Sequence, residues 1–236
     1  MKVSEFRKKE IAFFDKDRKQ VPYRGHTISD SNNLITLKKH LKITTKQYNT
    51  YVTIATYTEM PRFPHDRKQH WKEFREWVKI RDQTITSIDF MLDFDAKPTI
   101  NGIKKAWHDV KTSLPILQLL VGKDAKYLTI WFSGNKGFHI LGKCKVKTTA
   151  KVIVNYQKDI AQQLSLICPT VDTTIYDTAR LRKLLGSQVY SKNFGQTRVI
   201  PIQNEKEFNE LIQALEKKDK KYFANKQLTR LNNIQL

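Results

Sequence analysis

Apolar residues recur along the chain in two patterns, which predict two kinds of element. Runs rich in β-branched, aromatic or alternating apolar residues predict strands at residues 50–58, 87–95, 127–133, 138–143 and 197–202. Apolar residues spaced three or four apart predict helices at residues 71–81, 102–120, 149–166 and from Phe208 to Leu215. An interruption is expected near Pro115, and residues 3–20 are expected to be helical in part. This alternation of strands and helices predicts a mixed α and β class.

The predicted elements follow one another without a visible boundary. No internal repeat, low-complexity tract or linker rich in proline, glycine and serine occurs, and the 8 glycines and 7 prolines are scattered. We therefore expect one continuous domain over residues 1–236, with a core at about 50–202 and a helical extension at about 205–236.

The charge of the chain narrows the class of partner. With 43 Lys and Arg against 23 Asp and Glu, the formal net charge is +20, while 39% hydrophobic residues suffice for a folded core. Such an excess favours a polyanionic partner, because each cation placed near a phosphate releases condensed counterions. Nucleic acid is the first candidate and an anionic membrane surface the second, since no stretch approaches the ~20 apolar residues of a spanning helix. The alternative is a lysine-rich surface that serves solubility alone.

Cysteine usage and the first residues indicate a compartment. The chain has 2 cysteines, Cys144 and Cys168, which are too few for a disulfide scaffold or a four-ligand zinc site. The first residues contain no apolar stretch typical of a secretion signal. We therefore expect a cytoplasmic protein without zinc.

The first candidate for chemistry is the strand over residues 87–95. Its side chains alternate between two faces, so that the apolar residues Ile88, Phe90, Leu92 and Phe94 face a core. The opposite face carries Asp89, Met91, Asp93 and Asp95. Carboxylates that share one strand face repel one another unless a cation lies among them, and hard divalent ions prefer oxygen ligands. The alternative is a solvated strand face whose acids keep an edge from aggregating.

The second candidate is the turn between the strands at 127–133 and 138–143. Its polar and glycine residues are Ser133, Gly134, Asn135, Lys136, Gly137 and His139. Backbone N–H groups in such a turn can bind an anion, and the lysine adds a positive charge. The serine and histidine flank the turn and are expected on the same side of the hairpin. The alternative is an ordinary hairpin, because glycine and asparagine suit a tight turn for conformational reasons alone.

The third candidate is the segment over residues 169–187. Asp172 lies in a strand-like run, and a helix of about two turns is expected from a cap at Asp177 to a stop at Gly186. Arg180 and Lys183 would then share one helix face. A carboxylate that arrives from distant sequence is what a two-metal phosphoryl-transfer site needs. The alternative is a capped, basic surface helix.

Together and in this order, the three segments resemble the archaeo-eukaryotic primase superfamily, which includes primase small subunits and small primase–polymerases. The superfamily's first motif is an apolar strand ending in Asp-x-Asp, matched by residues 90–95. Its second is Ser-Gly-x-x-Gly-x-His, matched at every fixed position by residues 133–139. Its third is an apolar residue before Asp, matched by Val171 and Asp172. The basic stretch that follows in archaeal primases is matched by Arg180, Leu181, Gly186, Ser187 and Lys192, with Lys183 in place of a second arginine.

The resemblance implies a fold, a reaction and a set of site residues. The implied fold is α+β, with a mixed sheet like that of an RNA-recognition motif, a second small α/β subdomain and helical appendages at the ends. The implied reaction is template-directed nucleotide transfer with two Mg²⁺ or Mn²⁺ ions held by Asp93, Asp95 and Asp172. Ser133, Lys136 and His139 would bind the incoming triphosphate within the turn 133–139, and Arg180, Lys183 and Lys192 would add charge. The implied partners are a single-stranded DNA template, a primer strand and NTP or dNTP.

The chain departs from the superfamily's pattern at three points. Two cysteines cannot build the zinc knob that is usual in archaeal and eukaryotic small subunits. Asn135 and Lys136 stand where a basic pair is frequent, and Gln188-Val189-Tyr190 replaces a frequent histidine. These departures favour the smaller primase–polymerases of plasmids, mobile elements and CRISPR-associated loci.

Three alternatives to a primer-synthesising enzyme stay open from the sequence. One is an end-joining or gap-filling polymerase that extends primers without starting them. Another is a non-catalytic nucleic-acid-binding module that retains the fold and the charge. The last is a metal-dependent nuclease that uses the same acids, although no activating base is evident.

Overall fold

The computed structural model describes residues 9–15, 23–27, 31–40, 48–61, 71–121, 128–143, 149–178 and 180–226. The chain divides into two compact units, residues 1–88 with 177–184 and residues 89–176 with 185–236. Both contain helices and antiparallel strands, which confirms the predicted α+β class. Within the described ranges, no helix has both the length and the apolar character that crossing a bilayer requires. That the two units act as one catalytic domain stays a prediction.

The first unit is built on a four-stranded antiparallel sheet in the order β2-β1-β3-β8. A short strand, β4, pairs separately with residues 85–88 of β5. The elements of this unit are β1 (Ile11–Asp15), β2 (Tyr23–His26), α1 (Ser31–His40), β3 (Tyr48–Thr53), β4 (Ala55–Tyr57), α2 (Trp71–Gln83) and β8 (Leu181–Lys183). Its buried apolar cluster consists of Ile11, Phe13, Tyr48, Val52 and Leu184.

Strands replace expected helices at two places in this unit. Of residues 3–20, expected to be helical in part, residues 11–15 form β1, because Ile11 and Phe13 alternate into the cluster above while the backbone pairs with β2 and β3. Residues 3–8 and 16–20 lie outside the described part of the chain. The helix expected over 177–186 is replaced by β8, in which Arg182 pairs with Val52 of β3. Pairing with a strand more than a hundred residues earlier outweighs the local capping signals.

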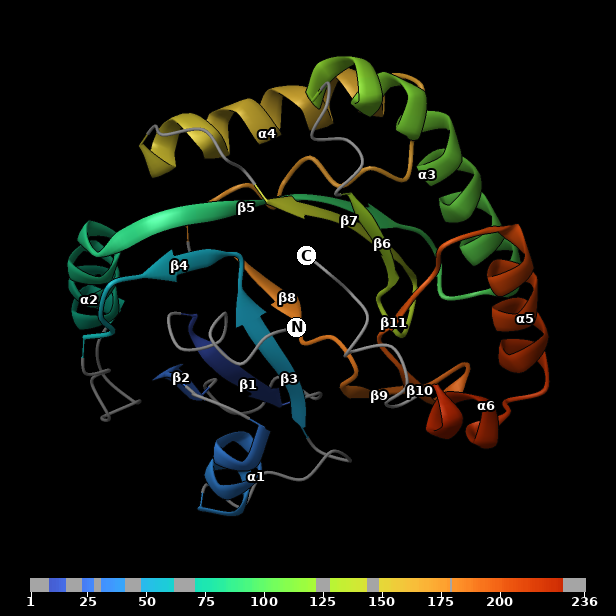
Figure 1. The fold of residues 1–236 in the computed structure, drawn as a ribbon, viewed down its shortest axis with the longest axis horizontal. Helices are drawn as coiled ribbons and strands as arrows, with labels where there is room; N and C mark the ends of the chain where they lie inside the picture. The colour runs from blue at the N-terminus through green and yellow to red at the C-terminus, as the bar shows by residue number, and fades with distance from the viewer. Residues whose placement is uncertain are drawn as a thin grey trace. The chain divides into compact units, whose positions relative to one another are not determined.

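The second unit carries an antiparallel sheet in the order β11-β6-β7-β5, followed by a two-stranded hairpin, β9–β10. Helices α3, α4 and α5 lie along the same side of β5, β6 and β7 (Figure 1). Strand β5 (Ile85–Asp95) enters from the first unit. The other elements are α3 (Ile100–Val121), β6 (Thr129–Phe132), β7 (Gly137–Lys143), α4 (Ala150–Ser165), β9 (Gln188–Ser191), β10 (Gly195–Arg198), β11 (Ile200–Pro201), α5 (Glu205–Glu216) and α6 (Lys220–Asn225).

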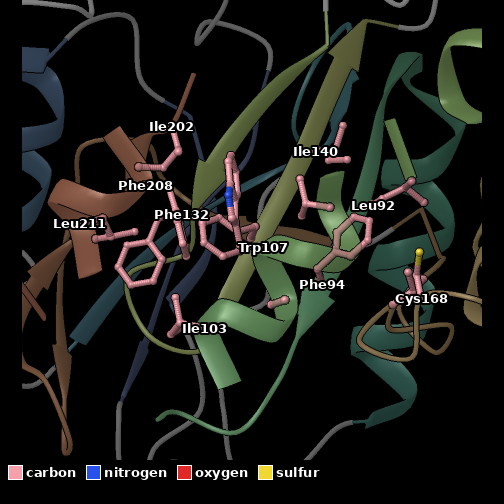
Figure 2. Packing of buried hydrophobic residues seen from close by; sticks show 14 of the residues in the cluster. Leu92, Phe94, Ile103, Trp107, Phe132, Ile140, Cys168, Ile202, Phe208 and Leu211 are labelled. Carbon is pink, nitrogen blue, oxygen red and sulfur yellow. The ribbon is translucent and has the colours of Figure 1, made fainter. Parts of the chain in front are cut away.

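The core of the second unit lies between its sheet and these helices. Figure 2 shows Leu92 and Phe94 of β5 among residues from α3, β6, β7 and α5. Trp107 of α3 stacks on Phe208 of α5 with ring centroids 4.9 Å apart, and its indole N–H donates to Glu205. One face of the sheet is therefore sealed by helices, which leaves the other for polar chemistry.

Most sequence-predicted elements agree with the structure, with small differences. Helix α3 continues through Pro115, so the expected interruption is wrong. Val110 and Leu117 are fully buried on either side of the proline, and this packing holds the helix together despite the missing N–H. The strand predicted at 50–58 divides at Ile54 into β3 and β4, and the strand predicted at 197–202 divides into β10 and β11.

Candidate metal and nucleotide site

The alternation of β5 places two acids on the sheet face opposite the helices. Phe90, Leu92 and Phe94 belong to the core cluster, whereas Asp93 and Asp95 point to the other side. Asp93 is only 4% exposed, so this is not the solvated edge that the alternative interpretation required. A buried carboxylate needs a compensating partner, and the face supplies several.

A third acid reaches β5 from distant sequence. Val171 forms an isolated antiparallel bridge with Phe94, and the Asp172 N–H donates to the Asp93 carbonyl at 2.9 Å. As a result, Asp93, Asp95 and Asp172 each offer a carboxylate oxygen within 4.8 Å of the other two. The Asp172 carboxylate also accepts hydrogen bonds from the N–H and hydroxyl of Thr174 at 2.8 and 2.6 Å, which fix its orientation.

The electrostatics of this acidic cluster favour a cation. Burial raises the pKa of Asp95, and the negative charge of Asp93 raises it further, against the opposing effect of Lys136. Both effects disfavour the ionised form of Asp95, and a bound cation would offset them. Three carboxylate oxygens suit a hard divalent ion such as Mg²⁺ or Mn²⁺, so the residues present fit the metal that the motif implies.

The turn between β6 and β7 is fastened to the end of β5. Ser133 N–H donates to the Gly137 carbonyl at 2.9 Å, and Ala96 N–H donates to the Lys136 carbonyl at 3.0 Å. The Lys136 ammonium lies 2.5 Å from a carboxylate oxygen of Asp95. Burial lowers the pKa of Lys136, but the hydrogen bond to Asp95 and the nearby acid charges raise it overall, so the lysine is held in its charged form.

Both glycines of this turn are required by close contacts. Gly134 has φ +82°, and a β-carbon there would lie 2.7 Å from the Val189 side chain of β9. A β-carbon on Gly137 would lie 1.7 Å from the carbonyl oxygen of Phe94. Only glycine lets the turn approach β5 and the β9–β10 hairpin so closely.

His139 lies directly opposite Asp93 in the β5–β7 ladder. Its Nε2 is 3.4 Å from a carboxylate oxygen of Asp93, and both side chains are almost fully buried. Ser133, which is 4% exposed, follows the residues of β6 that pair with β7, and Asn135 in the turn is partly exposed. The structure thus brings Lys136 and His139 of the second motif to two of the acids, Asp95 and Asp93.

The predicted basic residues fall in different places. Arg180 and Lys183 belong to the first unit, where the Arg180 carbonyl accepts from Ile54 N–H at 3.1 Å and Lys183 pairs with Tyr51. Lys192 is exposed in the turn between β9 and β10 of the second unit. Its neighbour Asn193 donates to the Pro98 carbonyl at 2.6 Å, three residues after Asp95, so this turn lies against the loop that follows β5.

Two helix residues that sequence reasoning missed support the segments that carry the acids. The Gln157 side chain of α4 donates to the Asp89 carbonyl at 3.0 Å and accepts from Met91 N–H at 3.2 Å, as a neighbouring strand would. Asp109 of α3 accepts two hydrogen bonds from Thr170. The available signal was a lone polar residue on the apolar face of an otherwise amphipathic helix.

The chain was compared with protein families, curated sequences and solved structures, and solved structures alone are similar to it. No protein-family model matches the chain, and no curated protein is similar to it in sequence. The polymerase domain of Mycobacterium tuberculosis Ligase D, solved with DNA, aligns at TM-score 0.52 and 11% identity over 92% of this chain and 80% of that chain. The catalytic domain of the primase RepB′, solved with initiator DNA, aligns at TM-score 0.46 and 11% identity over 96% of this chain and 94% of that one. The cyanophage S-2L primase–polymerase domain aligns at TM-score 0.43 and 12% identity over 76% of this chain and 74% of that one.

Of these three, the Ligase D polymerase domain aligns with a TM-score above 0.5, and at 11% identity the likeness concerns the fold. The chain therefore shares the fold of that polymerase domain, and the α+β fold that the resemblance implies is confirmed.

Proposed function

We propose that this chain is a DNA primase/polymerase, a nucleotidyltransferase that synthesises and extends primers on single-stranded DNA. The observation that carries the proposal is the convergence of Asp93, Asp95 and Asp172, whose carboxylate oxygens lie within 4.8 Å of one another beside Lys136 and His139. Acids at these motif positions, on this fold, are what template-directed phosphoryl transfer requires.

The three acids would hold two divalent ions, Mg²⁺ or Mn²⁺. When bound, such ions lower the pKa of an attacking 3′-hydroxyl and stabilise charge that develops on the α-phosphoryl group. His139 contacts the Asp93 carboxylate from the neighbouring strand, and Lys136 forms an ion pair with Asp95.

The glycine turn would bind the incoming triphosphate. Ser133, Lys136 and His139 would supply side-chain donors, and the backbone N–H groups of Gly134, Asn135 and Gly137 would add to them. Lys192, on the turn that lies against Pro98, would add positive charge to the same nucleotide. For Arg180 and Lys183, which belong to the first unit, a role in binding the nucleotide stays a prediction from the resemblance.

The DNA strands would be held mainly through their phosphates. A net charge of +20 favours a single-stranded template and primer strand whose binding weakens steeply with salt. Nucleoside and deoxynucleoside triphosphates are both candidate substrates.

The experiment is an incorporation assay with labelled NTP or dNTP, single-stranded template, Mg²⁺ or Mn²⁺, and no primer. Labelled product is expected from the wild type, and none from the variant that combines Asp93→Ala with Asp95→Ala, which should still bind DNA. Asp89→Asn is the matched control, because Asp89 lies on the same strand but outside the cluster of three acids. Incorporation by the double variant would show that the metal assignment is wrong.

A second candidate is a polymerase that only extends primers. It is favoured by the similarity to the polymerase domain of Mycobacterium tuberculosis Ligase D, which is solved in complex with DNA. The same assay with an annealed primer separates the two functions. Product with a primer and none without it would favour extension alone.

A further inference from the structure

A single carboxylate on α3 lies inside the core of the second unit. Asp109 is 3% exposed, and its neighbours along the buried face of α3 include Ala106, Val110 and Ser113, all at 0%. One carboxylate oxygen of Asp109 accepts hydrogen bonds from both the N–H and the hydroxyl of Thr170, at 2.9 and 2.8 Å. A buried carboxylate with two donors on one oxygen is a strong, directional anchor.

Thr170 begins the short segment that delivers the third acid. Its carbonyl accepts the Asp95 N–H at 2.7 Å, and Val171 bridges to Phe94. The Asp172 N–H then donates to the Asp93 carbonyl at 2.9 Å. The three residues therefore lie along β5, and both the N–H and the hydroxyl of Thr170 donate to Asp109.

We propose that Asp109 is a positioning residue for the acidic cluster, acting through Thr170. By fixing the start of segment 170–172, it sets where the Asp172 carboxylate lies relative to those of Asp93 and Asp95. Ligand groups must be held within about 0.5 Å of their working positions for a metal site to bind well. This inference rests on the proposed function, because it takes the cluster to be a metal site.

The competing explanation is that Asp109 only stabilises the core. The Cys168 thiol also contacts the Asp109 backbone carbonyl, at 3.5 Å, so the carboxylate lies in a densely packed place. A purely structural role lowers the melting temperature and leaves the metal affinity of the folded protein unchanged. A positioning role changes the metal affinity at temperatures where every variant is folded.

The test compares Thr170→Val with Thr170→Ser in the full chain. Valine keeps the shape and the backbone N–H but removes the hydroxyl donor, whereas serine keeps both donors. Ser113→Ala is the matched control, since Ser113 is a fully buried hydroxyl on the same helix that donates only to its own helix, to the Val110 carbonyl. Mn²⁺ affinity is measured by calorimetry without nucleotide, and melting temperature is measured in EDTA.

Thr170→Val is expected to weaken Mn²⁺ binding about tenfold, as loss of a supporting hydrogen bond does in other metal sites. Thr170→Ser and Ser113→Ala are expected to stay within about twofold of the wild type. Asp109→Asn is expected to lose more Mn²⁺ affinity than Thr170→Val. If Asp109→Asn fails to fold, the comparison of Thr170→Val with Thr170→Ser still tests the positioning role.

Two failures are distinguishable. If the wild type binds Mn²⁺, Asp93→Ala abolishes that binding and Thr170→Val binds like the wild type, the positioning role is wrong and the metal site stands. If the wild type binds no Mn²⁺, or Asp93→Ala binds it equally well, the metal site and this inference are both wrong.

Discussion

Lys136 and Asp95 form an ion pair where the β5–β7 ladder ends, with the ammonium nitrogen 2.5 Å from the carboxylate oxygen. The pairing is fixed by the backbone, because the Lys136 carbonyl also accepts the N–H of Ala96. A lysine in contact with a proposed metal ligand competes with the cation for the same oxygen. Loading the site with metal and nucleotide would therefore transfer Lys136 from Asp95 to a phosphate.

Replacing Lys136 by methionine should separate metal binding from nucleotide binding. Mn²⁺ affinity without nucleotide should stay equal or rise, because the competing cation is gone. The KM for nucleoside triphosphate should rise about tenfold, the loss expected for one charge-assisted hydrogen bond. Calorimetry and steady-state kinetics measure the two quantities, and a fall in Mn²⁺ affinity would contradict the exchange.

Replacing Asp95 by asparagine should stabilise the metal-free protein near neutral pH. The pKa of Asp95 is raised in the folded state above its ordinary value of 3.8, chiefly by burial and then by Asp93. Because the folded state binds this proton more tightly than the unfolded state, the stabilising contribution of protonated Asp95 is fully present below the unfolded pKa. It is lost as pH rises through the folded pKa and the carboxyl ionises. In EDTA, the melting temperature of the variant should exceed that of the wild type at about pH 7.5 and equal it at about pH 4. A variant less stable than the wild type at the higher pH would contradict this.

Adding a β-carbon at Gly137 should damage the site through the backbone. Gly137→Ala places that carbon 1.7 Å from the Phe94 carbonyl oxygen, so β5 and β7 must separate beside Asp95. We expect a loss of about 3 kcal/mol in the free energy of unfolding, with loss of metal binding. Gly195→Ala is the control, because nothing lies within 4 Å of its β-carbon and only its φ of +71° is strained, at a cost of about 1 kcal/mol. Equal effects of the two changes would argue against the close contact.

The turn between α5 and α6 should carry part of the DNA backbone contact. Together with the first two residues of α6, it exposes four lysines, Lys217, Lys218, Lys220 and Lys221, while the Asp219 carboxylate caps α6. Arg198 holds α6 to β10 through the Phe223 carbonyl at 3.0 Å, and Thr197 of β10 donates to Gly134 of the glycine turn. The lysine turn is thus connected to the candidate site through the β9–β10 hairpin.

Changing these four lysines to glutamine should lower single-stranded DNA affinity and reduce the salt slope by about 2–3 units. Fluorescence anisotropy over a salt series measures the slope. Changing Lys104 and Lys105, exposed on the outer helix α3, should leave it nearly unchanged. Equal salt slopes for the two variants would indicate that DNA is attracted by the overall positive charge and does not contact these four lysines specifically.

Local patterns were sufficient to predict the strand and turn that carry most of the site. Period-two alternation assigned Asp93 and Asp95 to one face of β5, and the glycine spacing located the turn before His139. The motif order placed Asp172 with them, and the structure brings it there through the bridge from Val171.

The remaining features depend on contacts between distant segments. Residues 181–183 carry helix-like caps on both sides, yet they pair with β3, a partner that no local signal shows. Asp109 and Gln157 look like interruptions of apolar helix faces until the segments they contact are known. Burial by tertiary contacts also keeps α3 continuous through Pro115.

Strand β5 is hydrogen-bonded along both edges over its acidic half, by β7 on one side and by Gln157 and residues 170–172 on the other. A slip of one residue in this pairing would turn Asp93 and Asp95 into the aromatic core and expose Phe94 and Leu92. The misregistered chain would bury two unpaired carboxylates, a far larger penalty than a slipped apolar strand incurs. The same acids that would bind metal therefore also protect the strand from misfolding.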